Sequence, residues 1–169
     1  MGQMMRELRL QRVVFDAVTF VPLSEERWRE RGFNQAELLA HGAALAGGHL
    51  PVVSLLTRSR HTDKQSFKSR SDRLRNMQGV FQASSDAIEL LVDVIRQSRS
   101  RARYGFFFSD KNSKEIENGQ LYREPIRLLL VDDVYTTGST INACAAVLQS
   151  ICMELGFPAE IYSLTWARS

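Results

Sequence analysis

Two acidic residues and a hydroxyl-rich turn stand side by side in the segment Leu128–Thr140, which reads LLLVDDVYTTGST. Asp132 and Asp133 supply a pair of carboxylates, which accept charge-assisted hydrogen bonds from sugar hydroxyls. The turn that follows offers hydroxyls, backbone N–H groups and one glycine, and it consists of Thr136, Thr137, Gly138, Ser139 and Thr140. This combination suits a ligand with a phosphate at one end and vicinal hydroxyls beside it, as in ribose 5-phosphate.

The surrounding residues predict a strand before the acids and a helix after the turn. Leu128–Val131 is an unbroken apolar run, typical of a strand that is buried on both faces of a parallel sheet. Apolar residues recur at helical spacing from Ile141 to Leu155, and Gly156 follows where a C-terminal cap is expected. Open α/β sheets bind ligands beyond the carboxyl ends of their strands, and a helix N-terminus favours an anion. The acids and the turn therefore lie where a phosphorylated ligand would bind.

The rest of the chain has the same alternation of strands and helices, which predicts an α/β fold. Further strands are expected at Ala17–Leu23, Val52–Leu56, Val80–Ala83 and Glu160–Ala167. A helix is expected to start at Asn34, which is a good N-cap, and to end at Gly47. The segment EERWRERGFNQ before it is expected to be a turn, and Ser85–Gln97 is expected to be helical.

Composition sets the class of protein. A chain of 169 residues that is 44% hydrophobic and 24% charged predicts one domain, spanning residues 1–169. The absence of a long apolar stretch and the charged Met1–Leu10 segment predict a cytoplasmic protein without membrane insertion. Cys144 and Cys152 lie two turns apart on the expected last helix, so we expect reduced core thiols and no zinc site.

Basic residues are unevenly distributed, although the formal net charge is only +3. Arginines cluster at residues 27–31, and a polar, basic stretch extends from Arg58 to Gly79. A loop of that length in a small domain is either a plain surface loop or a functional segment, and we expect a flexible lid at 58–79 that closes over a charged ligand. The clusters suit polyanions such as pyrophosphate, nucleotides or single-stranded nucleic acid.

Two other classes of protein share a strand that ends in an acid pair. A response-regulator receiver needs a later phosphoacceptor aspartate and a later lysine, but no aspartate follows Asp133 and the last lysine is Lys114. A Walker-type ATPase needs a glycine-rich loop that ends in Gly-Lys-Ser/Thr, which this chain does not have. The sequence excludes both classes.

The segment Leu128–Thr140 resembles the motif with which type I phosphoribosyltransferases bind 5-phosphoribosyl pyrophosphate (PRPP). Together with Arg29–Ala40, which reads RERGFNQAELLA, and with Thr57–Phe81, it resembles the ComF family of phosphoribosyltransferase-like competence proteins. The three segments occur in the order found in that family.

The resemblance implies a type I phosphoribosyltransferase fold, which is a mostly parallel, doubly wound sheet with helices on both faces. It implies Mg²⁺-dependent transfer of a 5-phosphoribosyl group to an unidentified acceptor, with Mg²⁺ held through PRPP and with no direct protein ligand. It assigns catalytic roles to Asp132, Asp133 and Arg31, and PRPP binding to these acids and to the turn Thr136–Thr140. Pyrophosphate and lid contacts are expected from Arg29, Arg31, Arg58 and Arg73.

Three departures from the family pattern bear on function. No cysteines precede Ala17, where ComF proteins commonly carry a four-cysteine zinc module. The segment 84–125 is longer than the usual connection and is expected to be an irregular insert. Thr136 stands where purine phosphoribosyltransferases carry an aspartate, and a hydroxyl is a poor general base near neutral pH.

The acceptor and the oligomeric state are not predicted. A role in natural competence and DNA uptake follows from the resemblance, and single-stranded DNA or other competence proteins are candidate partners. A PRPP or nucleotide sensor without turnover, or a single-stranded DNA-binding competence factor, remains the alternative function.

Overall fold

Three parallel strands form the central sheet, in the order β1-β4-β5. They comprise β1 (Ala17–Phe20), β4 (Ile126–Tyr135) and β5 (Ala159–Arg168) in a computed structural model that describes residues 13–58, 79–105 and 124–168. Ala17 pairs with Leu128 and Phe20 with Val131, whereas β5 pairs along the whole of β4. The predicted last strands are confirmed, but β4 continues through the acid pair to Tyr135. The acids therefore lie within the strand, near its carboxyl end as predicted.

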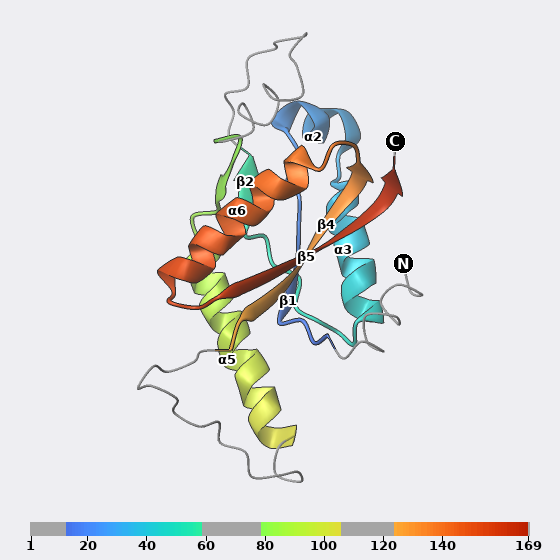
Figure 1. Ribbon diagram of the computed structural model, residues 1–169. Coiled ribbons are helices and arrows are strands. Elements are labelled where there is room, and N and C mark those ends of the chain that lie inside the picture. The colour runs from blue at the N-terminus through green and yellow to red at the C-terminus, as the bar shows by residue number, and fades with distance from the viewer. Residues whose placement is uncertain (1–12, 59–78, 106–123, 169) are drawn as a thin grey trace.

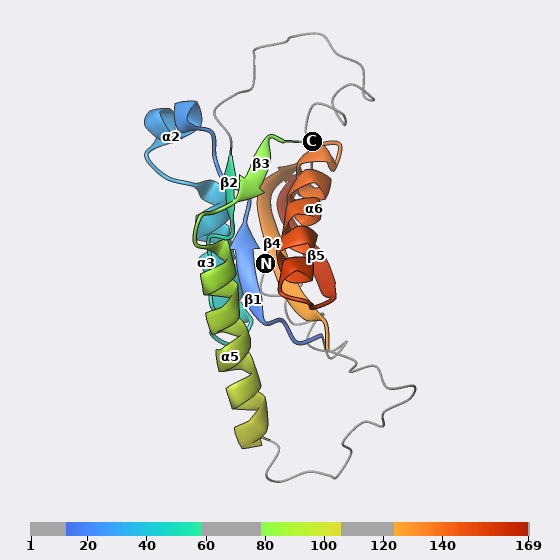
Figure 2. The same cartoon turned by 90° about the vertical axis from the view of Figure 1, so that its left-hand side faces the viewer.

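Helices cover both faces of this sheet (Figure 2). On one face, α3 (Gln35–Ala46) packs its small residues Ala36, Ala40 and Ala43 against β1 and β4. On the other face lie α6 (Ser139–Glu154), the first turns of α5 (Ala87–Gly105) and a small hairpin. The arrangement is an α/β fold compatible with the expected phosphoribosyltransferase architecture.

The hairpin corrects one prediction from the sequence. A strand was expected at Val52–Leu56, but there only Val52 bridges to β1, and Pro51 has no N–H with which to extend the pairing. The strand begins later, as β2 (Leu56–Arg58), and it pairs antiparallel with β3 (Phe81–Ala83). The predicted strand at 80–83 is thus confirmed.

A second correction concerns the segment EERWRERGFNQ, where a turn was expected. It contains the helix α2 (Glu25–Arg31), which Ser24 caps by accepting a hydrogen bond from the Arg27 backbone N–H at 3.4 Å. Gly32 ends the helix in the left-handed conformation, with φ of 72°. None of its residues is buried, so it carries no apolar stripe that periodicity could detect.

The remaining helices follow their sequence signals. Asn34 caps α3 by accepting a hydrogen bond from the Ala36 N–H at 3.0 Å, as predicted. The helix predicted at 85–97 is present and continues to Gly105, so the first part of the segment 84–125 is helical. Residues 106–123 lie outside the described residues, as does most of the expected lid. In the described part of the chain no helix has both the length and the apolar character needed to span a membrane.

Two hydrophobic clusters, one on each sheet face, hold the fold together. The side chains of β4 alternate between them, because Leu128 and Leu130 join the α6 side whereas Leu129 and Val131 join the α3 side. Cys144 and Cys152 are free, buried thiols in the α6-side cluster, which confirms their predicted place in the core. Burial raises the pKa of Cys144 to about 12, so this thiol is unreactive at neutral pH.

Candidate functional site at the carboxyl end of the sheet

Asp132 and Asp133 occupy the end of β4 and point to opposite faces of the sheet. The alternation along the strand directs Asp132 to the α6 side and Asp133 to the α3 side. Asp132 is 7% exposed, whereas Asp133 is half-buried. The Asp133 backbone N–H donates to Asp132 Oδ1 at 2.9 Å. The two carboxylates therefore reach a ligand at this edge from two directions.

Burial raises the pKa of Asp132 to about 6, and its hydrogen bonding and repulsion with Asp133 add to that effect. The backbone N–H of Asp133 and the positive charge of Arg27 act in the opposite direction. A carboxyl group in this state gains a proton on modest acidification. A cation or a set of hydroxyl donors that compensates its charge would stabilise the ionised form.

The turn after β4 leads into α6, whose N-terminus faces the same end of the sheet (Figure 1). Gly138 is the N-cap, with φ of 75°, and no side chain caps the helix. Thr137 Oγ1 and Ser139 Oγ share a hydrogen bond of 2.9 Å, while the Ser139 N–H makes only a long contact with Thr137 Oγ1, 3.5 Å. Amides at an uncapped helix start favour an anion.

Two features favour glycine at position 138. Its positive φ is disfavoured for residues with a Cβ, and a Cβ at this position would lie 2.9 Å from the Tyr135 hydroxyl oxygen. The Tyr135 ring therefore packs against the backbone of the turn. Thr136 and Thr137 are exposed beside it, whereas Ser139 and Thr140 are half-buried in the first turn of α6.

The predicted arginines lie on different elements. Arg29 and Arg31 lie on α2 and are exposed, and Arg31 donates to Gln35 Oε1 at 2.8 Å. Arg58 is the last residue of β2, so it is anchored in a strand and not in a lid as expected. Arg73 lies outside the described residues.

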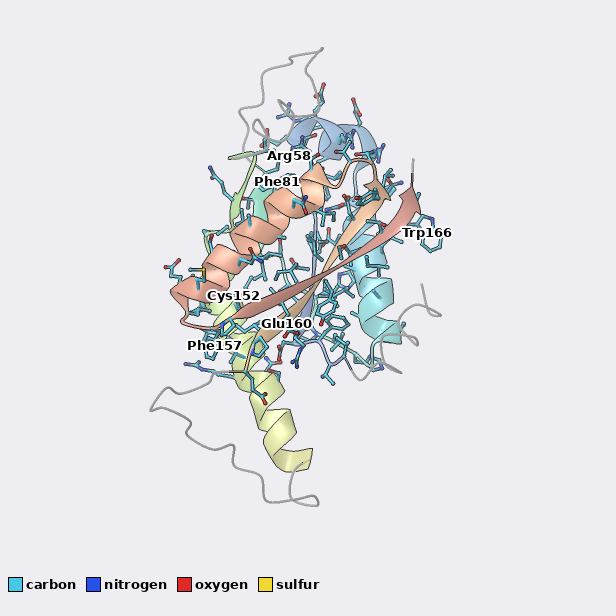
Figure 3. All side chains as sticks on the ribbon, viewed as in Figure 1. Arg58, Phe81, Cys152, Phe157, Glu160 and Trp166 are labelled. Atoms are coloured by element: carbon cyan, nitrogen blue, oxygen red, sulfur yellow. The ribbon has the colours of Figure 1, made fainter. Side chains whose placement is uncertain are left out.

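Arg58 is held at the edge of the site by its neighbours. Its guanidinium carbon lies 5.6 Å from the centre of the Phe81 ring, which is a cation–π contact. Figure 3 labels both side chains near the upper end of α6. Burial and the charge of Arg27 lower the pKa of Arg58. Among the described residues, no carboxylate forms an ion pair with it.

Arg27 was not among the residues predicted for the site, yet its charge reaches both Asp132 and Arg58. It lies on α2, above the carboxyl end of the sheet (Figure 1). The sequence showed a cluster of arginines at 27–31 but not which member faces the acids. Which arginine of the cluster lies near the acids depends on the helical geometry of α2, and the sequence had predicted a turn there.

No group of three or more histidine, cysteine, aspartate or glutamate side chains in the described ranges is placed to hold a metal ion. The acid pair instead presents carboxylate oxygens, the donors that Mg²⁺ prefers when it also keeps water or phosphate ligands. These residues fit a metal ion that arrives with a phosphorylated ligand.

Comparison with known proteins gives the following relatives. The chain is 32% identical over 149 residues to competence protein ComFC of Bacillus subtilis and 27% identical over 139 residues to competence protein F of Haemophilus influenzae. It is 29% identical over 129 residues to competence protein ComFC of Streptococcus pneumoniae. These matches cover 88%, 82% and 76% of this chain but only 43%, 46% and 40% of the relatives. The chain thus spans less than half the length of these relatives, and no family profile matches it.

Proposed function

We propose that this chain, which belongs to the ComF family, binds PRPP as its Mg²⁺ complex and transfers the 5-phosphoribosyl group to an acceptor. The observation that supports this most strongly is the position of the acid pair. Asp132 and Asp133 end a central parallel strand beside a helix start that lacks a side-chain cap. Sugar hydroxyls and a terminal phosphate match these two elements.

The 5-phosphate would bind at the turn Thr137–Thr140. Its donors would be the backbone amides at the start of α6, where the N-cap residue makes no side-chain hydrogen bond, and the hydroxyls of Thr137 and Ser139, which share a hydrogen bond. The positive end of the helix dipole supplies roughly half a charge, so the turn needs no lysine.

The ribose hydroxyls would donate to the carboxylates of Asp132 and Asp133. Hydrogen bonds to charged groups contribute about 1.5–3 kcal/mol each. Mg²⁺ enters as part of the substrate and supplies charge neutralisation on the pyrophosphate oxygens. The raised pKa of Asp132, about 6, means that this carboxylate is mostly ionised at neutral pH and is ready to accept such bonds.

The pyrophosphate would bind between Arg58 and Arg27. The charge of Arg27 disfavours the charged form of Arg58 in the ligand-free protein, and an anion between them would remove that repulsion. Arg29 and Arg31, which lie on the same helix as Arg27, provide further positive charge at the rim. These cations would stabilise the negative charge that grows on the departing group.

In the reaction the bond between ribose C1 and the pyrophosphate oxygen breaks, and its electron pair leaves with the pyrophosphate. Positive charge develops on the sugar ring, where the carboxylates of Asp132 and Asp133 stabilise it. The acceptor nitrogen then donates its lone pair to C1. Thr136 cannot act as an efficient base at neutral pH, so we expect an acceptor that does not depend on proton removal by this residue.

The names of the relatives support a wider role. All three are competence proteins, and we extend a role in competence to this chain as part of the proposal. The site described above would then supply a phosphoribosyl-transfer activity to competence.

Calorimetry with PRPP tests the proposal directly. We expect micromolar or tighter binding that requires Mg²⁺, and an Asp133→Asn variant should lose it at least tenfold through one weakened charge-assisted hydrogen bond. Glu160→Gln, a change at the opposite end of the sheet, is the matched control and should bind normally. Equal PRPP affinity in wild type and Asp133→Asn would refute the assignment of the acid pair.

A measurement of pyrophosphate release distinguishes the proposed transferase from the alternative of a PRPP sensor. Binding of PRPP without release, for any nitrogen acceptor supplied, would favour the alternative of a PRPP sensor. Binding of single-stranded DNA that weakens steeply with salt and does not depend on Asp132 or Asp133 would favour the DNA-binding alternative.

A further inference from the structure

The strand β5 is the outer strand of the central sheet, and in the described part of the chain no strand pairs with its far edge (Figure 1). It is 10 residues long, whereas a typical strand has about five or six. Among the described residues, no turn or loop makes a backbone hydrogen bond to Ala159–Arg168. Every second residue of β5 therefore directs its N–H and C=O toward an edge that can accept a further strand.

The edge of β5 also lacks the features that usually prevent such pairing. Proteins protect edge strands with lysine, proline, a β-bulge or a charge in the middle of the strand. β5 contains no lysine and no proline, and its register with β4 has a constant offset from Ala159 to Arg168, so no bulge interrupts it. Glu160 lies near its start and accepts a hydrogen bond of 2.8 Å from Arg127 of the same chain. The middle of the edge is therefore uncharged and open to a second strand.

The side chains of β5 differ between its two faces. Tyr162 and Leu164 pack in the α3-side cluster, and the alternation along the strand directs Trp166 to the same side. Ser163 and Thr165 lie between them and face the α6 side. Trp166 is 65% exposed, and Figure 3 shows its side chain standing clear of the ribbon near the end of β5. The open edge thus carries an unburied indole on one face and two hydroxyl side chains on the other.

We infer that β5 pairs with β5 of a second copy of this chain, antiparallel and about a twofold axis at Leu164, so that two three-stranded sheets join into one. A twofold axis perpendicular to the sheet places both α3 helices on one face and both α6 helices on the other. The interface is isologous, because the same edge supplies both partners. This inference does not depend on the proposed function.

Backbone geometry restricts the register of such a pair. The residues that direct N–H and C=O outward have the same parity in both copies, so two residues opposite each other must have numbers with an even sum. A centre at Leu164 meets this condition and extends the pairing over residues 160–168, nearly the whole strand. It sets Glu160 of one copy opposite Arg168 of the other, so like charges do not meet.

This register also matches the side chains to one another. It sets Tyr162 opposite Trp166, and Ser163 opposite Thr165, in both halves of the interface. Aromatic pairs and hydroxyl pairs are among the cross-strand pairs that stabilise antiparallel sheets.

The aromatic pair extends a group that already exists within one chain. Tyr162 meets Phe15 edge-on, with ring centroids 5.2 Å apart, and the indole of the second copy would pack beside them. A centre one residue earlier in the strand would instead place Trp166 opposite Glu160. The edge is therefore complementary to itself in backbone, side chains and charge, which favours a second copy over an unrelated peptide.

The two copies would run in opposite directions along the joined sheet. Their candidate sites would then lie at its opposite ends, each with its own acid pair, turn and arginines. Association should therefore leave PRPP affinity unchanged.

Light scattering measures the association. At about 100 µM the wild type should have twice the mass of the 19.2 kDa chain, since even a small specific interface associates at that concentration. Ser163→Lys should weaken the association about tenfold, because it brings lysines of the two copies together near the centre of the edge. Gln82→Lys is the matched control: it adds a lysine at an exposed position of β3 and should leave the dimer intact. Urea unfolding should show that both variants fold.

Disulfide crosslinking tests the register. Opposite residues of antiparallel strands have Cα atoms about 4.5–5.5 Å apart, which is within the range of a disulfide. A mixture of Ser163→Cys and Thr165→Cys should form a crosslinked dimer under oxidation, whereas neither variant alone should. The native Cys144 and Cys152 are buried and should not compete.

Three results would contradict the inference. A wild type that is monomeric at about 100 µM would overturn the dimer and leave the edge to a different partner. A dimer that Ser163→Lys and Gln82→Lys weaken equally, or that neither weakens, would have its contact elsewhere on the molecule. Crosslinking of Ser163→Cys alone would overturn the register centred on Leu164.

Discussion

The charged residues at the two ends of β4 have opposite electrostatic environments. At the amino end, Arg127 Nε donates to Glu160 Oε2 at 2.8 Å, and the Arg127 backbone N–H donates to Asp16 Oδ2 at 2.9 Å. Tyr162 completes the group through a hydrogen bond of 3.3 Å to Glu160. The hydrogen bond to Glu160 raises the pKa of Arg127, as expected for a satisfied cation.

At the carboxyl end, partly buried charged groups have neighbours of the same charge. Burial raises the pKa of Asp132, and the adjacent Asp133 adds to that effect. Burial also lowers the pKa of Arg58, and the charge of Arg27 adds to that effect. Each shift shows that the ordinary charged form is disfavoured in the ligand-free protein. The amino end therefore stabilises the fold, while the carboxyl end retains unfavourable electrostatics that a ligand with both anionic and hydroxyl groups would relieve.

The largest effect should come from matched arginine substitutions at the two ends. We expect Arg58→Leu to weaken PRPP binding about 100-fold, because it removes a charged contact to pyrophosphate worth about 3 kcal/mol. Ribose 5-phosphate, which lacks the pyrophosphate, should bind the wild type and Arg58→Leu with the same affinity. Calorimetry with both ligands measures the difference.

Arg127→Leu is the control for this experiment, since it removes an arginine from the same sheet but from the paired end. It should lower stability and leave PRPP affinity unchanged. If both variants lost PRPP affinity equally, the contrast between the two ends would have no functional meaning.

The second effect is a gain in stability, whereas most substitutions at buried positions lower the free energy of unfolding. Asp132→Asn should stabilise the ligand-free protein above pH 6, by about 2–3 kcal/mol, because it removes a buried carboxylate whose pKa is raised from 3.8 to about 6. The raised pKa means that Asp132 favours the folded state when protonated, and that this contribution is lost as pH rises through 6. Urea unfolding at pH 5 and pH 7.5 should show a larger gain at the higher pH.

The same variant should lose PRPP binding, since the asparagine cannot accept charged hydrogen bonds from the sugar. A gain in stability together with a loss of binding would identify Asp132 as a residue kept for function. An Asp132→Asn variant that is less stable than wild type at pH 7.5 would contradict the electrostatic argument.

The core of this site was predictable because its parts are contiguous in the sequence. The strand, the acids, the glycine turn and the helix from Ser139 all follow one another, and local patterns predict each of them. The end of the strand was not predictable in this way. Aspartate is unfavourable in strands, and only the pairing with Thr165–Arg168 carries β4 past the acids.

The cations were less predictable because their positions depend on contacts between distant segments. Arg58 is placed by the pairing of β2 with β3, which brings Phe81 beneath it. Arg27 is placed by a short helix that has no buried residue and hence no apolar periodicity. The pattern of a cluster at 27–31 indicated anion binding but could not distinguish among its members.

A third, smaller effect compares two glycines at opposite ends of α6. Gly138 and Gly156 have φ of 75° and 74°, so an alanine at either position should lower the free energy of unfolding by about 1–2 kcal/mol. Of the two, only Gly138 lies in the turn proposed to bind the 5-phosphate, where it packs against Tyr135. We expect Gly138→Ala alone to weaken PRPP and ribose 5-phosphate binding, by about tenfold.

Unfolding and calorimetry on the two variants separate backbone strain from ligand binding. Equal losses of ligand affinity in Gly138→Ala and Gly156→Ala would mean that a general weakening of α6, and not the turn, is responsible.

The smallest effect should come from the paired end. Glu160→Gln removes the charge that Arg127 contacts, and both side chains are partly exposed, 36% for Arg127 and 42% for Glu160. Solvent screens such a pair, so the loss in the free energy of unfolding should be about 0.5–1 kcal/mol and should shrink further in 1 M salt. A thermal unfolding series at low and high salt measures this loss of stability.

The PRPP affinity of Glu160→Gln should be unchanged, because the substitution lies at the opposite end of the strand from the acids. Calorimetry measures that affinity. If Glu160→Gln reduced PRPP affinity as much as Arg58→Leu, then charge anywhere on the sheet would matter, and the division of β4 into a stabilising end and a binding end would be wrong.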